Sequence, residues 1–178
     1  SYTVAQAADQ IIRGEPGWSN VLGAPATVTY AFRASAPATM PDDTAGFSRF
    51  NAAQIAQAEL ALHGWSDVAN IHFMRVGVGT ASEAAYSDSA TILFGNYSSG
   101  SDGSAAFAYF PGSSAASAQS GDVWLNSTSG SNTNPTTGNY GGMVLVHEIG
   151  HAIGLAHPAD YDAEGEPSYS ADALYYED

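Results

Sequence analysis

Apolar side chains recur at helical spacing in three stretches of the chain. Residues 4–12 carry such a repeat and end before a glycine and a proline, which predicts a short amphipathic helix. Asn51 is followed three residues later by Gln54, the pattern of a capping box, and predicts a longer helix that closes at His63-Gly64. The apolar run that begins at Met143 predicts a third helix, which crosses the core.

Short β-rich runs, bounded by Gly, Ser, Asn and Asp, predict strands between these helices. They cover residues 27–33, 71–76, 91–94, 105–110 and 123–125. The run at 105–110 ends at Pro111, and proline is tolerated on an edge strand. Residues 97–104 and 126–142 are dominated by Ser, Gly, Asn and Thr, and we expect them to be long surface loops.

Composition narrows the class of protein. A chain of 178 residues with 44% hydrophobic content is long and apolar enough for one folded domain with a sizeable core. Its 18 acidic residues against 4 basic ones give a net charge of -14, which argues against nucleic acid or an anionic membrane as a partner. No apolar stretch approaches the roughly 18 residues of a membrane span. Cysteine is absent, which excludes disulfides and thiolate metal ligands.

The third predicted helix carries a metal-ligand pattern. His147 and His151 lie one helical turn apart, so both rings project from one face and can hold one metal ion. Gly154 can end the helix at positive φ, which lets the chain swing His157 back to the same ion. Three protein ligands leave the fourth tetrahedral position open to water, the arrangement of a catalytic zinc site.

Glu148 lies next to the first ligand and is the candidate general base. Its carboxylate can take a proton from zinc-bound water as the water attacks a peptide carbonyl, and can return it to the leaving amine. A helix with two surface histidines is the plainer interpretation, but the extended motif matches at six positions together, which favours the metal site. His63 and His72 lie outside the motif and are interpreted as ordinary histidines.

Beyond the motif, the chain resembles the serralysins, bacterial secreted alkaline metalloproteases of the metzincin group. The resemblance covers nearly the whole chain, and Pro158 after the third histidine is similar to this branch of the group. The other segments that carry it are residues 2–10, 65–71 and 94–98, Tyr161 and residues 176–178.

The resemblance implies an α+β metzincin fold, in which a twisted, mostly parallel sheet with an edge strand is backed by two long helices. Residues 1–154 would form the upper subdomain with the zinc helix, and residues 155–178 the start of an incomplete lower subdomain. An extended peptide would bind antiparallel to the edge strand at Ala106, Phe107 and Ala108. Backbone pairing of this kind gives affinity without demanding one side-chain sequence.

The resemblance also implies features beyond this chain. The family has a methionine turn beneath the zinc and a tyrosine just after it, and both should follow Asp178, so we expect the chain to be a fragment. Its remaining C-terminal part, or a proteinaceous inhibitor, is an expected partner besides protein or peptide substrates. Family members are secreted and extracellular, and usually carry a C-terminal repeat domain that binds calcium.

The expected function, assigned to the longer parent enzyme, is zinc-dependent hydrolysis of peptide bonds in extended protein substrates, and the activity of this chain by itself is left open. A different class of function is also open: a zinc-binding fragment that does not cleave and acts as a binding or inhibitor-docking scaffold. A third hypothesis is zinc-dependent hydrolysis of a non-peptide substrate, since a fold alone does not fix the substrate.

Overall fold

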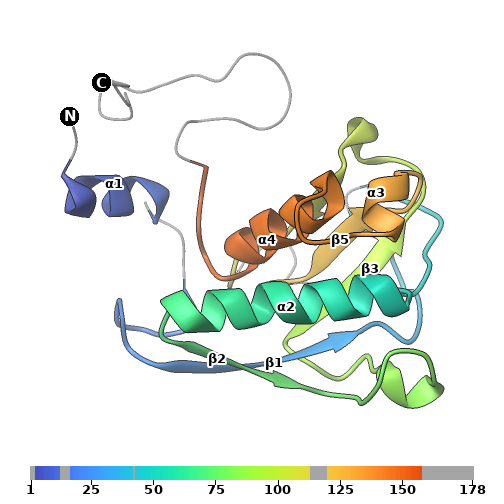
Figure 1. Ribbon diagram of the computed structural model, residues 1–178, viewed down its shortest axis with the longest axis horizontal. Coiled ribbons are helices and arrows are strands. Elements are labelled where there is room, and N and C mark those ends of the chain that lie inside the picture. The colour runs from blue at the N-terminus through green and yellow to red at the C-terminus, as the bar shows by residue number, and fades with distance from the viewer. Residues whose placement is uncertain (1–2, 13–16, 42, 113–119, 158–178) are drawn as a thin grey trace.

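The computed structural model describes residues 3–12, 17–41, 43–112 and 120–157. Its strands form one sheet in the order β2-β1-β3-β5-β4, parallel except for β4, which runs antiparallel to β5 (Figure 1). The expected mostly parallel sheet with an edge strand is therefore confirmed. The strands are β1 (Ala26–Phe32), β2 (Ile71–Arg75), β3 (Ile92–Tyr97), β4 (Ala106–Ala108) and β5 (Val123–Asn126).

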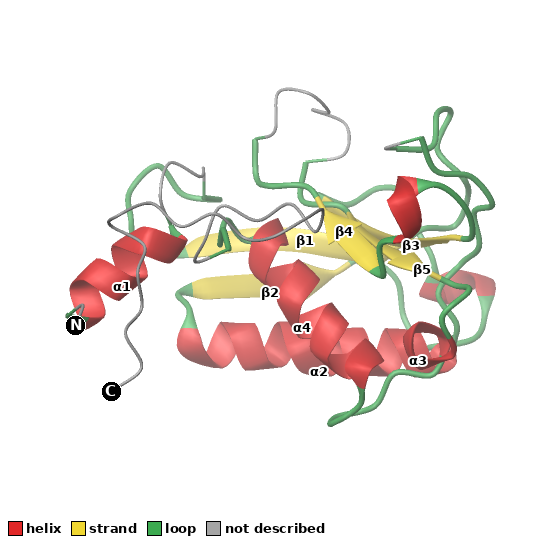
Figure 2. Cartoon of the chain, turned by 90° about the horizontal axis from the view of Figure 1, so that it is seen from above, coloured by secondary structure: helices red, strands yellow, loops and turns green. Residues whose placement is uncertain are grey.

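Two longer helices back this sheet, as expected. Helix α2 contacts β2, α4 contacts β4 and β5, and the two helices cross in contact with each other (Figure 2). Among the described residues no helix is long and apolar enough to cross a membrane. The helices are α1 (Val4–Ile11), α2 (Ala52–Val68), α3 (Gly130–Thr133) and α4 (Tyr140–Ala152), with short 3-10 turns η1 (Glu83–Ala85) and η2 (Ser101–Gly103).

The core lies between the sheet and the two helices. Phe32 and Phe94 of the sheet pack against Phe50, with ring centroids 5.4–5.8 Å apart, and all three are fully buried. Ile55 of α2 and Ile149 of α4 join the same cluster. Each such side chain contributes roughly 2 kcal/mol by leaving water, so this cluster fixes both helices on the sheet.

Helix α2 begins as predicted and ends later than predicted. Asn51 accepts from the backbone N–H of Gln54, whose side chain accepts from the N–H of Asn51 in return. The prediction that this helix closes at His63-Gly64 is wrong, because it continues to Val68. Trp65 lies beyond the glycine and donates from Nε1 to the carbonyl of Val146 on α4, at 3.0 Å. This tertiary anchor outweighs the roughly 1 kcal/mol that glycine costs inside a helix.

The interpretation of residues 126–142 as one long loop is also wrong, since they contain α3 and the first turn of α4. The glycines here serve close packing. A Cβ on Gly141 would lie 1.9 Å from the carbonyl oxygen of Ser131, and one on Gly142 would lie 2.1 Å from that of Thr136. A helix can therefore begin at Tyr140 because its next two residues, Gly141 and Gly142, have no side chains to collide with these carbonyls.

Strands β3 and β4 also differ in length from the predictions. Strand β3 runs on to the buried Tyr97, so the predicted loop at 97–104 begins later. Its last residues gain a new neighbour, because Ser48 and Asn96 exchange backbone hydrogen bonds where β1 has already ended. Strand β4 is shorter than the predicted 105–110 and comprises Ala106–Ala108.

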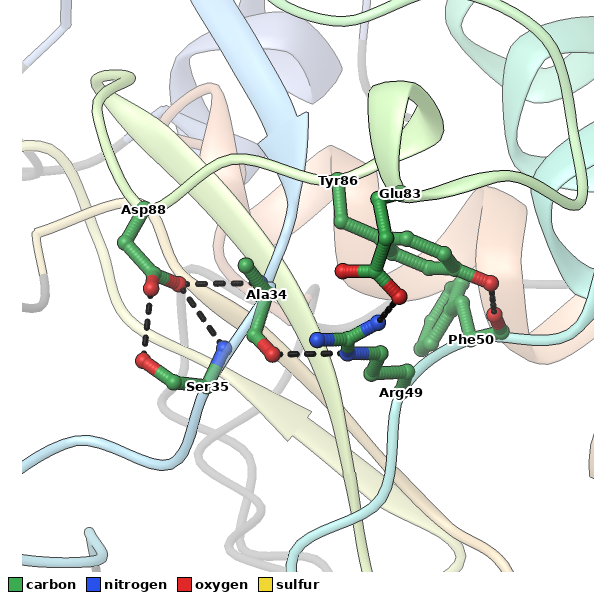
Figure 3. Close-up of polar contacts among 7 residues, drawn as sticks. All are labelled: Ala34, Ser35, Arg49, Phe50, Glu83, Tyr86 and Asp88. Atoms are coloured by element: carbon green, nitrogen blue, oxygen red, sulfur yellow. Dashed lines mark hydrogen bonds and ion pairs between the residues drawn. The ribbon is translucent and has the colours of Figure 1, made fainter.

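A polar cluster around Arg49 links the loops that follow β1 and β2 to the segment before α2 (Figure 3). The guanidinium donates from Nε to the carbonyl of Ala34 at 2.7 Å and from Nη1 to Glu83 at 2.7 Å. It also lies over the ring of Tyr86, 4.9 Å from its centroid, and the hydroxyl of Tyr86 donates to the carbonyl of Phe50. Three separate segments are thereby joined through one cation.

Candidate metal centre

Helix α4 sets the first two candidate ligands. Asn139 caps its N-terminus by accepting from the N–H of Gly142, and the buried Leu145 and Ile149 fix which face turns to the core. His147 and His151 then project from the opposite side, with their Nε2 atoms 3.0 Å apart. The predicted placement of two rings one turn apart follows directly from helical geometry.

A glycine turn brings the third histidine to the same place. Gly154 has φ of +107° and donates to the carbonyl of His151, while Leu155 donates to the carbonyl of Gly150, both at 2.9 Å. These two bonds define a Schellman motif, which ends a helix and reverses the chain. His157 follows, and its Nε2 lies 3.0 Å from that of His147 and 3.1 Å from that of His151.

The three convergent nitrogens fit a single metal ion. Two ligands bound at about 2.0–2.1 Å in a tetrahedron lie about 3.3 Å apart, close to the separations observed here. Among the described residues, His147, His151 and His157 form the one group whose donor atoms can share an ion. Nδ1 of His151 lies 2.6 Å from the carbonyl of Leu155, which only accepts, so this nitrogen carries the proton. Its Nε2 therefore presents a lone pair, the form that binds metal.

Desolvation favours the neutral form of the two helical histidines. It lowers the pKa of His151 to about 4, against a smaller opposing effect from the hydrogen bond to Leu155. Burial, followed by the nearby His157, also lowers the pKa of His147. Only a deprotonated imidazole nitrogen can bind a metal, so the site is suited to an ion at neutral pH.

Glu148 is buried beside the cluster, with 7% of its surface exposed. Burial raises the pKa of its carboxyl to about 8, because a charge is less well solvated there. A carboxyl that exchanges a proton near neutral pH is a candidate acid or base. The sequence predicted this role from position alone, and the burial adds a physical reason.

Among the residues that the structure describes, strand β4 forms an open edge of the sheet next to α4. It is the last strand of the sheet, and α4 contacts it directly. Phe107 pairs with Trp124, and the flanking bonds run from Tyr109 to Asp122 and from Asn126 to Ala105. In an antiparallel ladder this register turns the N–H and C=O groups of Ala106 and Ala108 away from β5. The edge therefore offers two residues to an added strand.

Two neighbours of the site were missed by sequence reasoning. The ring of Phe110 meets that of His151 edge-on, with centroids 5.5 Å apart. Trp18 donates from Nε1 to the carbonyl of Ala152, the last residue of α4, at 2.8 Å. Neither residue belongs to a local pattern that could have signalled the contact. His63 and His72, by contrast, are exposed and lie outside the cluster, as interpreted from the sequence.

Several sequence-based expectations fall outside the described residues. Pro158, Tyr161 and residues 176–178 belong to this part of the chain, as does nearly all of the expected lower subdomain at 155–178.

The sheet, its two backing helices and the histidine cluster together define an α+β protein of the metzincin class. The chain belongs to the Matrixin family, whose model matches residues 24–175. It is similar over its whole length to serralysin G of Dickeya chrysanthemi, at 45% identity over 187 residues, and to metallopeptidase AprA of Pseudomonas marginalis, at 45% over 184 residues. It spans 37% and 36% of the length of these two relatives.

Proposed function

We propose that the protein is a zinc-dependent endopeptidase in which His147, His151 and His157 hold the metal and Glu148 is the general base. The observation that carries the proposal is the convergence of three imidazole nitrogens beside a buried carboxyl group. Membership of the Matrixin family and the similarity to serralysins support the same activity.

Zinc is the metal that this donor set favours, since it accepts neutral imidazole ligands and needs no thiolate. When bound, it supplies a Lewis acid for the peptide carbonyl and makes water acidic enough to act as a nucleophile near neutral pH. Glu148 accepts the proton of the attacking water and later delivers it to the amine that leaves. Burial raises the pKa of Glu148 to about 8, so its carboxyl can exchange a proton near neutral pH.

We further propose that the substrate binds as an extended strand along Ala106, Phe107 and Ala108. The outward N–H and C=O groups of the two alanines are the groups that an added antiparallel strand would pair with. Such recognition reads the backbone, so it supports protein or peptide substrates with little demand on side chains. The contact of β4 with α4 would bring the bound peptide past the histidines.

Residues 1–154 are assigned to the upper subdomain and 155–178 to the start of the lower one, by analogy with the family. The same analogy supports a secreted, extracellular protein whose natural partners include the complementary C-terminal part or a proteinaceous inhibitor. Calcium binding through a C-terminal repeat domain stays a prediction of the resemblance alone.

The test compares casein cleavage by the zinc-loaded protein, its chelated form and a Glu148→Ala variant. We expect cleavage by the first alone. Equal cleavage by Glu148→Ala would contradict the assigned mechanism. Zinc binding without cleavage of casein would instead support the non-cleaving scaffold. Hydrolysis of small esters without cleavage of casein would support the non-peptide alternative.

A further inference from the structure

The turn that presents His157 is held from outside by the N-terminal segment of the chain. Besides the Schellman bonds and the bond from His151 to Leu155, two contacts from outside α4 restrain it. Trp18 donates to the carbonyl of Ala152, and the N–H of Ala156 donates to the carbonyl of Ile11 at 2.6 Å. Figure 1 shows α1 beside the segment that follows α4.

The backbone hydrogen bonds at the end of α4 leave the carbonyl of Ala152 to accept from Trp18. A helix ends with carbonyls that have no partner within it. Here the carbonyl of Ile149 accepts from the N–H of Ile153, and the Schellman motif satisfies the carbonyls of Gly150 and His151. The carbonyl of Ala152 is the next in the series, and it accepts a hydrogen bond from the indole N–H of Trp18.

Trp18 is itself fixed in position. Its ring packs against the hydrophobic core, and a Cβ built on Gly121 would lie 2.6 Å from its Cζ2 atom. Gly121 has φ of +78°, so both space and backbone favour glycine there. The indole is thus a rigid donor, and it orients the peptide plane between Ala152 and Ile153 where the turn begins.

We propose that Trp18 is a positioning residue for the third metal ligand, acting through its hydrogen bond to the carbonyl of Ala152. Without that bond the first peptide of the turn can rotate, and His157, five residues on, loses its fixed approach to the other two imidazoles. Groups that orient metal ligands typically change affinity by about 10–100-fold when removed. We expect the lower end of this range, because Trp18 acts through backbone. The inference rests on the proposed metal function.

Trp65 provides a matched control. Its indole also donates to a carbonyl of α4, that of Val146, at 3.0 Å. That carbonyl lies within the helix, where the N–H of Gly150 is its regular partner. Losing the Trp65 bond therefore leaves the turn unchanged.

The experiment measures Co²⁺ affinity by chelator competition and records the Co²⁺ absorption spectrum, which reports ligand geometry. All samples carry Glu148→Gln, so that they cannot digest themselves. Trp18→Phe is expected to weaken Co²⁺ binding about tenfold and to alter the spectrum, whereas Trp65→Phe should match the parent in both. Urea unfolding of the metal-free proteins shows whether each variant is folded.

A second variant separates the hydrogen bond from the ring. Benzothienylalanine at position 18 keeps the shape of the indole but has no donor, and it should behave like Trp18→Phe. Parent-like affinity and spectrum in either position-18 variant, or equal losses in Trp18→Phe and Trp65→Phe, would overturn the positioning role alone. Failure of the parent to bind Co²⁺ would overturn the proposed metal function as well.

Discussion

The imidazole of His151 donates from Nδ1 to the carbonyl oxygen of Leu155 over 2.6 Å. One partner is a candidate ligand on α4, and the other lies just past the glycine turn that leads to His157. The bond therefore orients one ring and restrains the segment that carries the next. The candidate metal centre is therefore built by the helix and its turn together.

Replacing His157 with alanine should weaken zinc binding by more than about 100-fold. Removing a group that only orients a metal ligand already lowers metal affinity by about 10–100-fold, and losing a ligand itself should cost more. His72→Ala is the control, since His72 is exposed on β2, away from the cluster. Competition with a fluorescent zinc chelator measures both affinities. Similar zinc affinity in the two variants would show that His157 is no ligand.

Gly154→Ala should destabilise the metal-free protein by about 1–2 kcal/mol, because a side chain is strained at positive φ. The φ of Gly154, +107°, lies in that region. Urea unfolding gives the free-energy change, and zinc affinity should fall in parallel as His157 is displaced.

Gly64→Ala is the control for this glycine. Position 64 lies inside α2, and a Cβ there would meet nothing within 4 Å. Alanine should therefore stabilise the protein by about 0.5–1 kcal/mol. A loss of stability at both positions would mean that backbone conformation is not what distinguishes them.

Gly141→Ala should cost about 1–3 kcal/mol, the usual range for overpacking. The added Cβ would lie 1.9 Å from the carbonyl oxygen of Ser131, which belongs to backbone and cannot simply swing away. Gly130→Ala, at the first residue of α3, meets nothing within 4 Å and should be close to neutral. Thermal unfolding of the two variants checks the difference, and equal melting temperatures would refute the close packing of α3 on α4.

Asp88→Asn should destabilise the protein at pH 7 and have little effect in strong acid. Burial raises the pKa of Asp88, but hydrogen bonds from the Ser35 hydroxyl and the N–H groups of Ser35 and Ala34 outweigh it and lower the pKa overall (Figure 3). A lowered pKa means that the folded state favours the ionised form. Its stabilising effect is complete above the unfolded pKa of about 3.9 and is lost as the pH falls through the folded value.

Urea unfolding of the parent and Asp88→Asn between pH 7 and pH 2 measures this effect. The difference in free energy should shrink on acidification, and a gap that widens in acid would contradict the sign. Asp67→Asn serves as the control, since Asp67 is an exposed carboxylate near the end of α2.

Much of the site follows from sequence because its geometry is local. The spacing of His147 and His151 dictates that their rings share a face, and a glycine at position 154 permits the turn to His157. The capping box at Asn51 and the short β-rich runs are local in the same sense. Each depends on residues only a few positions apart, so periodicity and turn chemistry predict them.

Tertiary structure decided the features that depend on distant residues. Helix α2 passes through Gly64 because Trp65 is anchored on α4. Gly141 and Gly142, in the first turn of α4, make room for the backbone carbonyls of Ser131 in α3 and of Thr136 after it. The pKa of Glu148 is raised by burial, which depends on tertiary packing. The hydrogen bond from Trp18 to Ala152 joins segments separated by most of the chain. The sequence determined which chemistry the chain carries. Only packing decided how rigidly it is held, because long-range contacts leave no periodic trace among neighbouring residues.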